Sequence, residues 1–282
     1  MTAFLAVDWG TTNRRVYLLN DGQLIASEQD DKGVRALSSK DYPVEIASIR
    51  RRFGDLPMIL AGMVGSTIGW VSVPYAEMPV DLPSLAAHIH RIDDRTVIVT
   101  GVCQRSPDDV MRGEEVQLLG AVSQGAVPGD ALLCQPGTHC KWVRMRGGAI
   151  TSFSTAMTGE LFSLLKQHSI LAPQLRDSAM DGEGFRAGVV RGAAGKLQSA
   201  LFEIRAKAML TGAVDQSSYA SGLLIGEDIA DRVSAEPIYI LADETLGNLY
   251  RTAIETLGGR AFVIDSHVSF ISGITKIKEM IG

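Results

Sequence analysis

The chain alternates short apolar runs with glycine-rich turns, and one such pattern occurs twice. In the first copy, apolar residues 4–7 and 16–19 flank a turn at Gly10 and Thr11. The second copy lies 127 positions later, with its turn at Gly137 and Thr138. Two apolar runs joined by a tight turn of small residues predict a β-hairpin. The repeat therefore predicts two related lobes whose paired loops face each other across a cleft.

Further helical and strand patterns follow each hairpin. Helical patterns or helix-forming compositions cover residues 42–53, 110–122, 159–168, 199–210, 216–232, 246–257 and 270–280. Apolar runs predict additional strands over residues 24–27, 57–65 (running into a glycine loop), 96–101, 149–154, 238–242 and 261–264. This succession predicts an α/β fold of two lobes, each a mixed sheet with flanking helices. Turn-forming residues at 125–129 mark the boundary, so we expect lobes at 1–124 and 125–282.

Composition narrows the class of protein. The chain has 282 residues, 46% of them hydrophobic, which supports full cores and excludes a disordered chain. Its net charge of −5 provides no basic surface for nucleic acid. Three cysteines without framework spacing, and no apolar run near the roughly 20 residues of a membrane span, favour the cytoplasm. We expect small-molecule ligands and no membrane partner; monomer and homodimer both stay open.

The two glycine–threonine turns have the composition of phosphate-binding loops. Glycine lets the backbone approach a ligand closely, and threonine hydroxyls with free N–H groups suit phosphate oxygens. The copies differ where Asp8 of the first aligns with Gln135 of the second. A carboxylate on one side only suits a magnesium–phosphate site. The alternative is that both are ordinary hairpins with small turn residues.

Other nucleotide and metal motifs are weaker. The sequence has no G-x-x-x-x-G-K-[ST], which excludes a P-loop phosphotransferase. Residues 182–187 match a loose dinucleotide-binding pattern, but they follow a polar stretch rather than a strand, so we expect a surface loop. His88 and His90 lie in a polar stretch expected to be helical, and His139 lacks zinc spacing, so we expect no structural metal.

Several blocks resemble known families. Asp8-Trp-Gly-Thr-Thr-Asn-Arg14, Pro136-Gly-Thr-His139 and the two-lobe layout resemble the actin/hexokinase/Hsp70 superfamily of ATP-using proteins, carbohydrate kinases among them. Longer blocks resemble 2-dehydro-3-deoxygalactonokinase: Ala61-Gly-Met-Val-Gly65 with Gly69-Trp70, Val110-Met-Arg-Gly-Glu-Glu115, Gln117-Leu-Leu-Gly120, Pro136-Gly-Thr-His-Cys-Lys-Trp142, Met157-Thr-Gly-Glu-Leu161, Leu201-Phe-Glu-Ile-Arg205 and Ser221-Gly-Leu-Leu-Ile-Gly226. They occur in order along most of the chain, and the residues after 226 match more weakly.

The resemblance implies an actin-like (ribonuclease H-like) fold and a kinase reaction. In this family ATP phosphorylates the terminal 6-hydroxyl of 2-dehydro-3-deoxy-D-galactonate, giving 2-dehydro-3-deoxy-6-phospho-D-galactonate in galactonate catabolism. The first lobe would then hold the sugar acid and one phosphate loop, and the second lobe the other phosphate loop and adenosine. A kinase for a related keto-sugar acid and a non-catalytic actin-like nucleotide switch are the two alternatives.

The resemblance also implies roles for the loop residues. We expect Asp8 to hold Mg²⁺, directly or through water, the alternative being a carboxylate that satisfies its own turn. The residues expected around the phosphates of ATP are Gly10, Thr11, Thr12, Asn13, Arg15, Gly137, Thr138, His139 and Lys141. Of these, Lys141 or Arg15 would neutralise charge on the transferring phosphoryl group.

A kinase also needs a general base near the acceptor hydroxyl. In related kinases this carboxylate lies at the head of the helix that follows the last strand of the first lobe. By similarity the candidates are Glu114, Glu115 and Asp109, and we favour Glu114. The alternative is that these carboxylates only interact with the helix dipole. The carboxylates Glu114 and Glu115 after Arg112 favour a kinase over a nucleotide switch, because a switch needs no general base.

Residues 62–70 have the composition of a substrate loop. Glycines such as Gly65, with the neighbouring Ser66, would offer N–H groups, and Trp70 would form a flat wall or else pack in the core. The carboxylate of a sugar acid needs a cation, which a bidentate arginine supplies. Arg112, Arg14 and Arg205 are the candidates, and the sequence does not choose among them.

Residues 238–258 resemble the strand–loop–helix that holds adenosine in sugar kinases. Those kinases usually have glycines after the strand, whereas this chain has Ala242 and Asp243. We expect Asp243 to bind a ribose hydroxyl instead.

Overall fold

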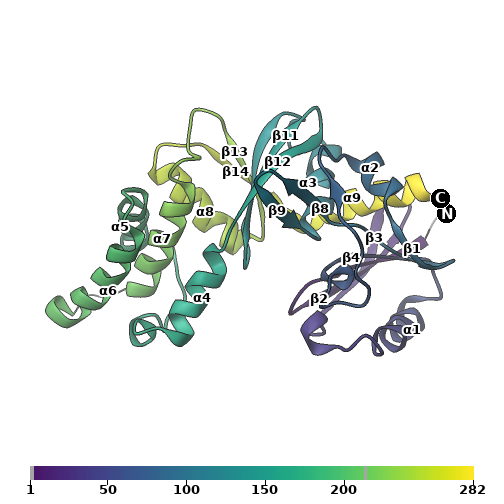
Figure 1. Ribbon diagram of the computed structural model, residues 1–282, viewed down its shortest axis with the longest axis horizontal. Helices are drawn as coiled ribbons and strands as arrows, with labels where there is room; N and C mark the ends of the chain where they lie inside the picture. Colours follow the sequence, from purple (N-terminus) through teal and green to yellow (C-terminus); the bar gives the residue numbers. More distant parts are fainter. Residues whose placement is uncertain (1–2, 213–214) are drawn as a thin grey trace. The chain divides into compact units, whose positions relative to one another are not determined.

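The computed structural model describes residues 3–212 and 215–282, and its first sheet is built around the N-terminal hairpin (Figure 1). The strand order is β3-β2-β1-β4-β7-β6. The strands are β1 (Ala3–Trp9), β2 (Arg14–Asn20), β3 (Gln23–Asp30), β4 (Met58–Gly62), β6 (His90–Asp93) and β7 (Thr96–Ile98). β1 and β2 pair antiparallel, whereas β1, β4 and β7 run parallel.

The second sheet repeats this order. It runs β12-β11-β10-β13-β14, so each strand has a counterpart at the same place in the first sheet. The strands are β10 (Ala131–Gln135), β11 (Cys140–Arg146), β12 (Ala149–Ala156), β13 (Ile238–Ala242) and β14 (Ala261–Asp265). β10, β13 and β14 run parallel, as β1, β4 and β7 do. The internal repeat predicted from the two hairpins is confirmed at the level of topology.

A small third sheet, β5-β8-β9, is not predicted by the sequence. Its strands are β5 (Ala76–Glu77), β8 (Val102–Arg105) and β9 (Asp108–Met111). The helix expected over residues 110–122 is wrong at its start, because Val110 and Met111 pair with β8. Gly113, with φ of 109°, then separates this strand from α3 (Glu114–Ser123).

Contacts divide the chain into two compact units. Unit 1 comprises Met1–Asp130, Arg144–Phe153 and Ser266–Gly282, and unit 2 comprises Ala131–Val143 and Ser154–Asp265. Unit 1 contains α1 (Tyr42–Phe53), α2 (Leu82–Ala87), α3, α9 (Ser266–Ile281) and the 3-10 turns η1 (Val34–Ala36) and η2 (Met63–Gly65). Unit 2 contains α4 (Thr158–His168), α5 (Glu183–Ala193), α6 (Leu197–Thr211), α7 (Gln216–Ile229), α8 (Glu244–Thr256) and the 3-10 turn η3 (Ala172–Gln174).

This grouping differs from the expected boundary at residue 124/125 in three segments, since unit 1 also contains residues 125–130, residues 144–153 and the C-terminal helix α9. In Figure 1, α9 lies along α3, and the contact is very close. A Cβ on Gly120 would lie 2.0 Å from the carbonyl oxygen of Ser269, and one on Gly273 would lie 2.1 Å from that of Val116. Glycines therefore let the last helix pack against the first unit. The functional roles expected for the lobes stay predictions.

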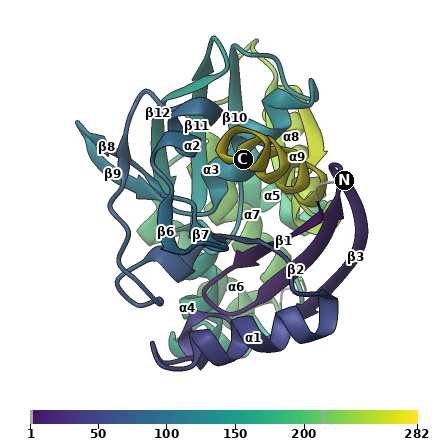
Figure 2. The same cartoon turned by 90° about the vertical axis from the view of Figure 1, so that its right-hand side faces the viewer.

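Helix α1 covers one face of the first sheet (Figure 2). Pro43 lies in its first turn, where a missing N–H is tolerated, and Gly54, with φ of 113°, ends it. Its apolar side, including Tyr42 and Ile46, packs against buried Val7 of β1 in one core. Burying such side chains stabilises the unit by about 1.5–3 kcal/mol each.

In unit 2, α5 and α7 pack along two facing pairs of glycines. A Cβ on Gly188, Gly192, Gly222 or Gly226 would lie within 2.2 Å of a carbonyl oxygen of the other helix. The surface loop expected at residues 182–187 is wrong, because α5 begins at Glu183. Its small residues serve helix packing, which a local pattern does not reveal.

The other predicted helices of both units are confirmed with shifted ends. Residues 159–168, 199–210 and 216–232 correspond to α4, α6 and α7, while α8 and α9 begin earlier than expected, at Glu244 and Ser266. The helical stretch expected around His88 and His90 is wrong, since α2 ends at Ala87 and His90 pairs with β7. Of the residues described, no helix is long and apolar enough to cross a membrane.

Candidate functional site

Hydrogen bonds to backbone carbonyl groups hold the turn between β1 and β2. The N–H of Gly10 donates to Asn13 O at 2.9 Å, and η1 donates back through Val34 N to Gly10 O at 3.0 Å. Gly33 makes this approach possible, because a Cβ there would lie 2.3 Å from the carbonyl carbon of Thr12. In the described part of the chain, the N–H groups and hydroxyls of Thr11 and Thr12 have no partner. The loop therefore presents donors suited to anionic oxygens.

Asp8 lies at the end of β1, just before this turn. Its carboxylate faces the first turn of α3, where Gln117 Nε2 donates to Asp8 Oδ2 at 3.5 Å. Burial raises the pKa of Asp8 to about 6, Arg15 opposes this effect, and the charge of Glu114 adds to it. The carboxylates of Asp8 and Glu114 are therefore close enough for their charges to interact.

The first turn of α3 separates the roles of its two glutamates. Glu115 is fully buried, and its oxygens accept hydrogen bonds from Gly113 N at 2.9 and 2.7 Å. Burial raises the pKa of Glu115 to about 8, so this side chain is neutral at neutral pH. Glu114 is half-buried and accepts a hydrogen bond from Arg112 N at 2.9 Å. Of the two glutamates, only Glu114 is accessible, and its charge is the one that raises the pKa of Asp8.

Asp109 is not brought to this turn. It lies on β9, opposite Gln104 of β8, and its carboxylate accepts a hydrogen bond from Val110 N at 2.7 Å. The charge interactions that shift the pKa of Asp8 do not include Asp109.

Arg15 lies on β2 directly opposite Asp8. Its guanidinium donates to Gln29 Oε1 at 2.7 and 3.2 Å, and Nη1 contacts His267 Nδ1 at 2.7 Å. Tyr17 also contacts His267, at 3.1 Å. The sequence does not reveal that His267 contacts the predicted site residue Arg15, because His267 reaches β2 from a distant part of the chain.

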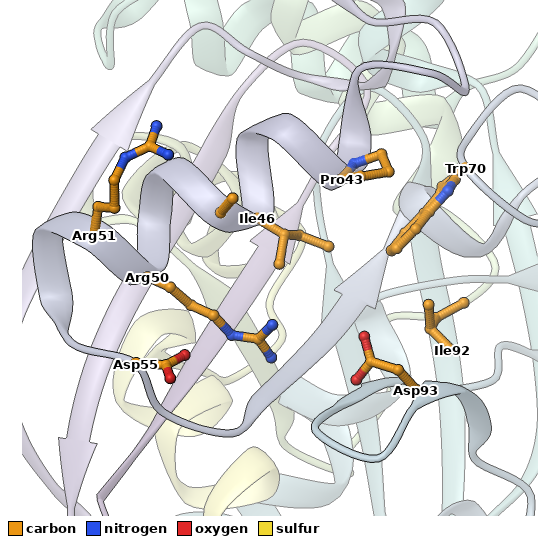
Figure 3. Close-up of a pocket in the computed structure, with 9 residues that line it drawn as sticks. Pro43, Ile46, Arg50, Arg51, Asp55, Trp70, Ile92 and Asp93 are labelled. Atoms are coloured by element: carbon orange, nitrogen blue, oxygen red, sulfur yellow. The ribbon is translucent and has the colours of Figure 1, made fainter.

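The residues of the predicted substrate loop lie in two different environments. Gly65 and Ser66 are buried, and the Ser66 hydroxyl donates to Met63 O at 2.7 Å. Trp70 stacks on Tyr42 at 5.6 Å and lines a cavity of about 550 Å³ beside α1. In Figure 3 the Trp70 ring faces Ile46 and Ile92. Its role as a wall for substrate stays a prediction.

The second turn, in unit 2, rests on the start of α4. Glu160 N donates to Thr138 O at 2.8 Å, and a Cβ on Gly159 would lie 2.2 Å from Gly137 O. Thr138 is exposed, and its hydroxyl and N–H have no partner in the part of the chain described. The exposed His139 pairs with Glu160 at 2.6 Å. This loop, like the first, offers donors at a helix start.

Lys141 and Asp243 are already engaged in unit 2. Lys141 is 5% exposed, and its Nζ donates to Thr155 Oγ1 at 2.7 Å. Asp243 is the N-cap of α8 and accepts from Leu246 N at 2.9 Å. The sequence singles out Asp243, and its capping role explains why an aspartate follows β13. Contacts of either residue with phosphate or ribose stay predictions.

The sequence matches a family model described as 2-keto-3-deoxy-galactonokinase over residues 8–277. The match includes the segment after residue 226, where the motif resemblance is weaker. A 2-dehydro-3-deoxygalactonokinase of Escherichia coli (strain K12) is 34% identical over 294 residues, which cover 100% of this chain and 99% of that protein.

Solved structures agree with this match. A crystal structure of a Sinorhizobium meliloti protein assigned as a 2-dehydro-3-deoxygalactonokinase has a TM-score of 0.91 and 32% identity, covering 99% of this chain and 96% of that one. The activator of 2-hydroxyisocaproyl-CoA dehydratase from Clostridium difficile, with bound ADPNP, has a TM-score of 0.54 at 10% identity, covering 99% and 96%. The second likeness concerns the fold alone. The expected actin-like α/β fold is confirmed.

Proposed function

The chain belongs to the 2-keto-3-deoxy-galactonokinase family and is a sugar-acid kinase, and we propose that it uses ATP to phosphorylate the 6-hydroxyl of 2-dehydro-3-deoxy-D-galactonate. The product is then 2-dehydro-3-deoxy-6-phospho-D-galactonate, an intermediate of galactonate breakdown, formed in the cytoplasm. The family match over residues 8–277 supports the reaction class and the substrate.

Within the structure, the observation that carries the proposal is the charge interaction between Asp8 and Glu114 beside the Gly10–Asn13 turn. The turn supplies unpaired N–H groups for phosphate, and the second loop at Gly137 and Thr138 supplies similar donors. Phosphoryl transfer depends mainly on positioning and on stabilising charge, which such donors provide.

Asp8 fits a Mg²⁺ ligand. Its carboxylate is half-buried, and its charge interacts with that of a second carboxylate, Glu114. Mg²⁺ typically takes one or two carboxylates and keeps water and phosphate oxygens for its other positions. When bound, Mg²⁺ neutralises charge on the phosphates.

In the proposed reaction, Glu114 accepts the proton of the acceptor hydroxyl. The hydroxyl oxygen forms a bond to the γ-phosphorus while the bond from that phosphorus to the β–γ bridging oxygen breaks, and ADP leaves. Glu115 is unsuited to this role, because it is fully buried and holds its proton at neutral pH. Arg15, opposite Asp8, would stabilise charge on the transferring group.

The test is ADP release measured with a panel of acceptors: the galactonate-derived acid, its gluco epimer, other 2-keto-3-deoxy acids and neutral ketoses. We expect ADP only with a sugar acid present, and the highest kcat/KM with the galacto compound. A preference for another acid would assign the related kinase instead. If the protein binds nucleotide but turns over no acceptor, the proposal is overturned and the non-catalytic nucleotide switch is the remaining alternative.

A further inference from the structure

Arg112 is a buried cation whose hydrogen-bonding capacity is mostly unused. Its side chain is 7% exposed, and Nη2 donates to the carbonyl oxygen of Val73 at 2.7 Å. In the described part of the chain, Nε and Nη1 are buried without any hydrogen-bond partner, and no carboxylate pairs with the guanidinium. Buried charges are normally paired and hydrogen-bonded, so an anionic ligand would complete this one.

The groups around the Arg112 guanidinium do not neutralise its positive charge. The Tyr75 ring covers one face at 4.2 Å from the ring centroid. Gly65 lies against Nη1, where a Cβ would come within 2.9 Å. The nearby Glu115 does not neutralise Arg112, since burial raises the pKa of that carboxyl to about 8 and keeps it uncharged at neutral pH.

The other two arginines considered from the sequence are committed elsewhere or exposed. Arg14 donates to Asp30 at 2.5 and 3.1 Å and to Glu45 at 2.9 Å. Arg205 lies on α6 in unit 2, where Nη1 donates weakly to Ile170 O at 3.5 Å. Of the three, Arg112 alone combines burial with unpaired donors, and it also lies next to the predicted loop glycine Gly65.

We propose that Arg112 binds the carboxylate of the sugar-acid substrate and thereby selects acids over neutral sugars, with Gly65 leaving room for the guanidinium, since a Cβ there would meet Nη1. This inference rests on the proposed function. Nε and Nη1 are shielded from water, so the carboxylate reaches them after a covering side chain moves. Tyr75, whose ring covers the guanidinium and which is 38% exposed, is the side chain that would move.

The experiment compares the full-length wild type with Arg112→Gln and Arg112→Lys on two acceptors, 2-dehydro-3-deoxy-D-galactonate and its methyl ester. Hydrogen bonds to a charged group predict a loss in kcat/KM for the acid of about 10- to 100-fold in Arg112→Gln. The ester, which lacks the negative charge, should lose less than about threefold, so the preference for the acid collapses. We expect Arg112→Lys to lie in between, because it keeps the charge but loses the fork of donors.

Two further variants keep the test decisive. Arg105→Gln, an exposed arginine on β8 paired with Glu77, is the control and should leave both acceptors unchanged. If Arg112→Gln does not fold by circular dichroism, Gly65→Ala decides, because its methyl group would displace the guanidinium, and it should raise the KM of the acid selectively.

Equal losses on acid and ester, or unchanged kinetics of a folded variant, would overturn the inference while the kinase assignment stands. Failure of the wild type to release ADP with any sugar acid would instead overturn the proposed function.

Discussion

The backbone N–H of Gly113 donates to both carboxylate oxygens of Glu115, at 2.9 and 2.7 Å. Gly113 has φ of 109°, a conformation that favours glycine, and it joins β9 to α3. The two hydrogen bonds that the fully buried Glu115 accepts from Gly113 therefore hold the turn before Glu114 at the start of the helix. In the proposed reaction Glu115 therefore positions its neighbour, and Glu114 accepts the proton.

Two replacements of Glu115 should distinguish the contribution of its shape to stability from that of its ionisation. The folded pKa of about 8 lies above the ordinary 4.5, so the wild type loses stability as the pH rises through that interval. Glu115→Gln keeps an acceptor for Gly113 and should lack this pH slope in urea unfolding. Glu115→Ala should lower the free energy of unfolding by about 2–4 kcal/mol at neutral pH. Equal pH slopes in wild type and Glu115→Gln would show that Glu115 is already ionised.

Glu114→Gln should remove most of the turnover. Loss of a general base typically lowers kcat by about 10²- to 10⁴-fold, while the amide preserves the shape of the side chain. Binding of ATP, measured by calorimetry, should change little, because the proposed reaction places Glu114 at the acceptor hydroxyl rather than at the nucleotide. Asp109→Asn on β9 is the matched control and should retain activity. If Asp109→Asn loses activity and Glu114→Gln keeps it, the base is Asp109.

Asp8→Asn should stabilise the protein while it weakens Mg²⁺-dependent activity. The folded pKa of about 6 exceeds the ordinary 3.8, so ionisation of Asp8 reduces stability as the pH rises between these values. Above this interval the asparagine variant should be more stable by on the order of 1–3 kcal/mol in metal-free buffer. Thermal unfolding at about pH 4 and about pH 8 checks the sign. Full activity at ordinary Mg²⁺ would show that Asp8 is only a turn residue.

Gly222→Ala should destabilise unit 2. A Cβ there would lie 2.1 Å from the carbonyl oxygen of Phe185, so α5 and α7 would have to separate. Overpacking of this kind costs about 1–3 kcal/mol or more, which denaturant unfolding measures directly. Ala187→Leu, on the exposed side of α5, is the control and should change stability by less than about 0.5 kcal/mol. A comparable loss in both variants would mean that the helix contact is not tight.

Much of the fold follows from local patterns. The two hairpins, the parallel strands β4 and β13 and most helices are encoded by apolar runs and turn residues within short segments. The donors of the first turn were equally predictable, because Gly10 and the threonines beside it are neighbours in sequence. Comparison of the two hairpins singled out Asp8 as a predicted Mg²⁺ ligand, and similarity to related kinases singled out Glu114 as the predicted base.

The rest depends on contacts between distant segments. The short strands β8 and β9 gain their stability from pairing, and His267 meets Arg15 from more than 250 positions away. The choice of Arg112 over Arg14 required knowing that Asp30 and Glu45 already occupy Arg14. No local signal distinguishes a paired from an unpaired arginine.

The contact of α9 with α3 also sets the order of folding during protein synthesis. Residues 266–282 are synthesised after every other part of unit 1, yet Gly273 lies directly against Gly120 of α3. A nascent chain that ends after Asp130 therefore exposes the face of α3 that α9 later covers. Unit 1 therefore reaches its final packing only once residues 266–282 have been synthesised, and a truncation before residue 266 would leave it incomplete.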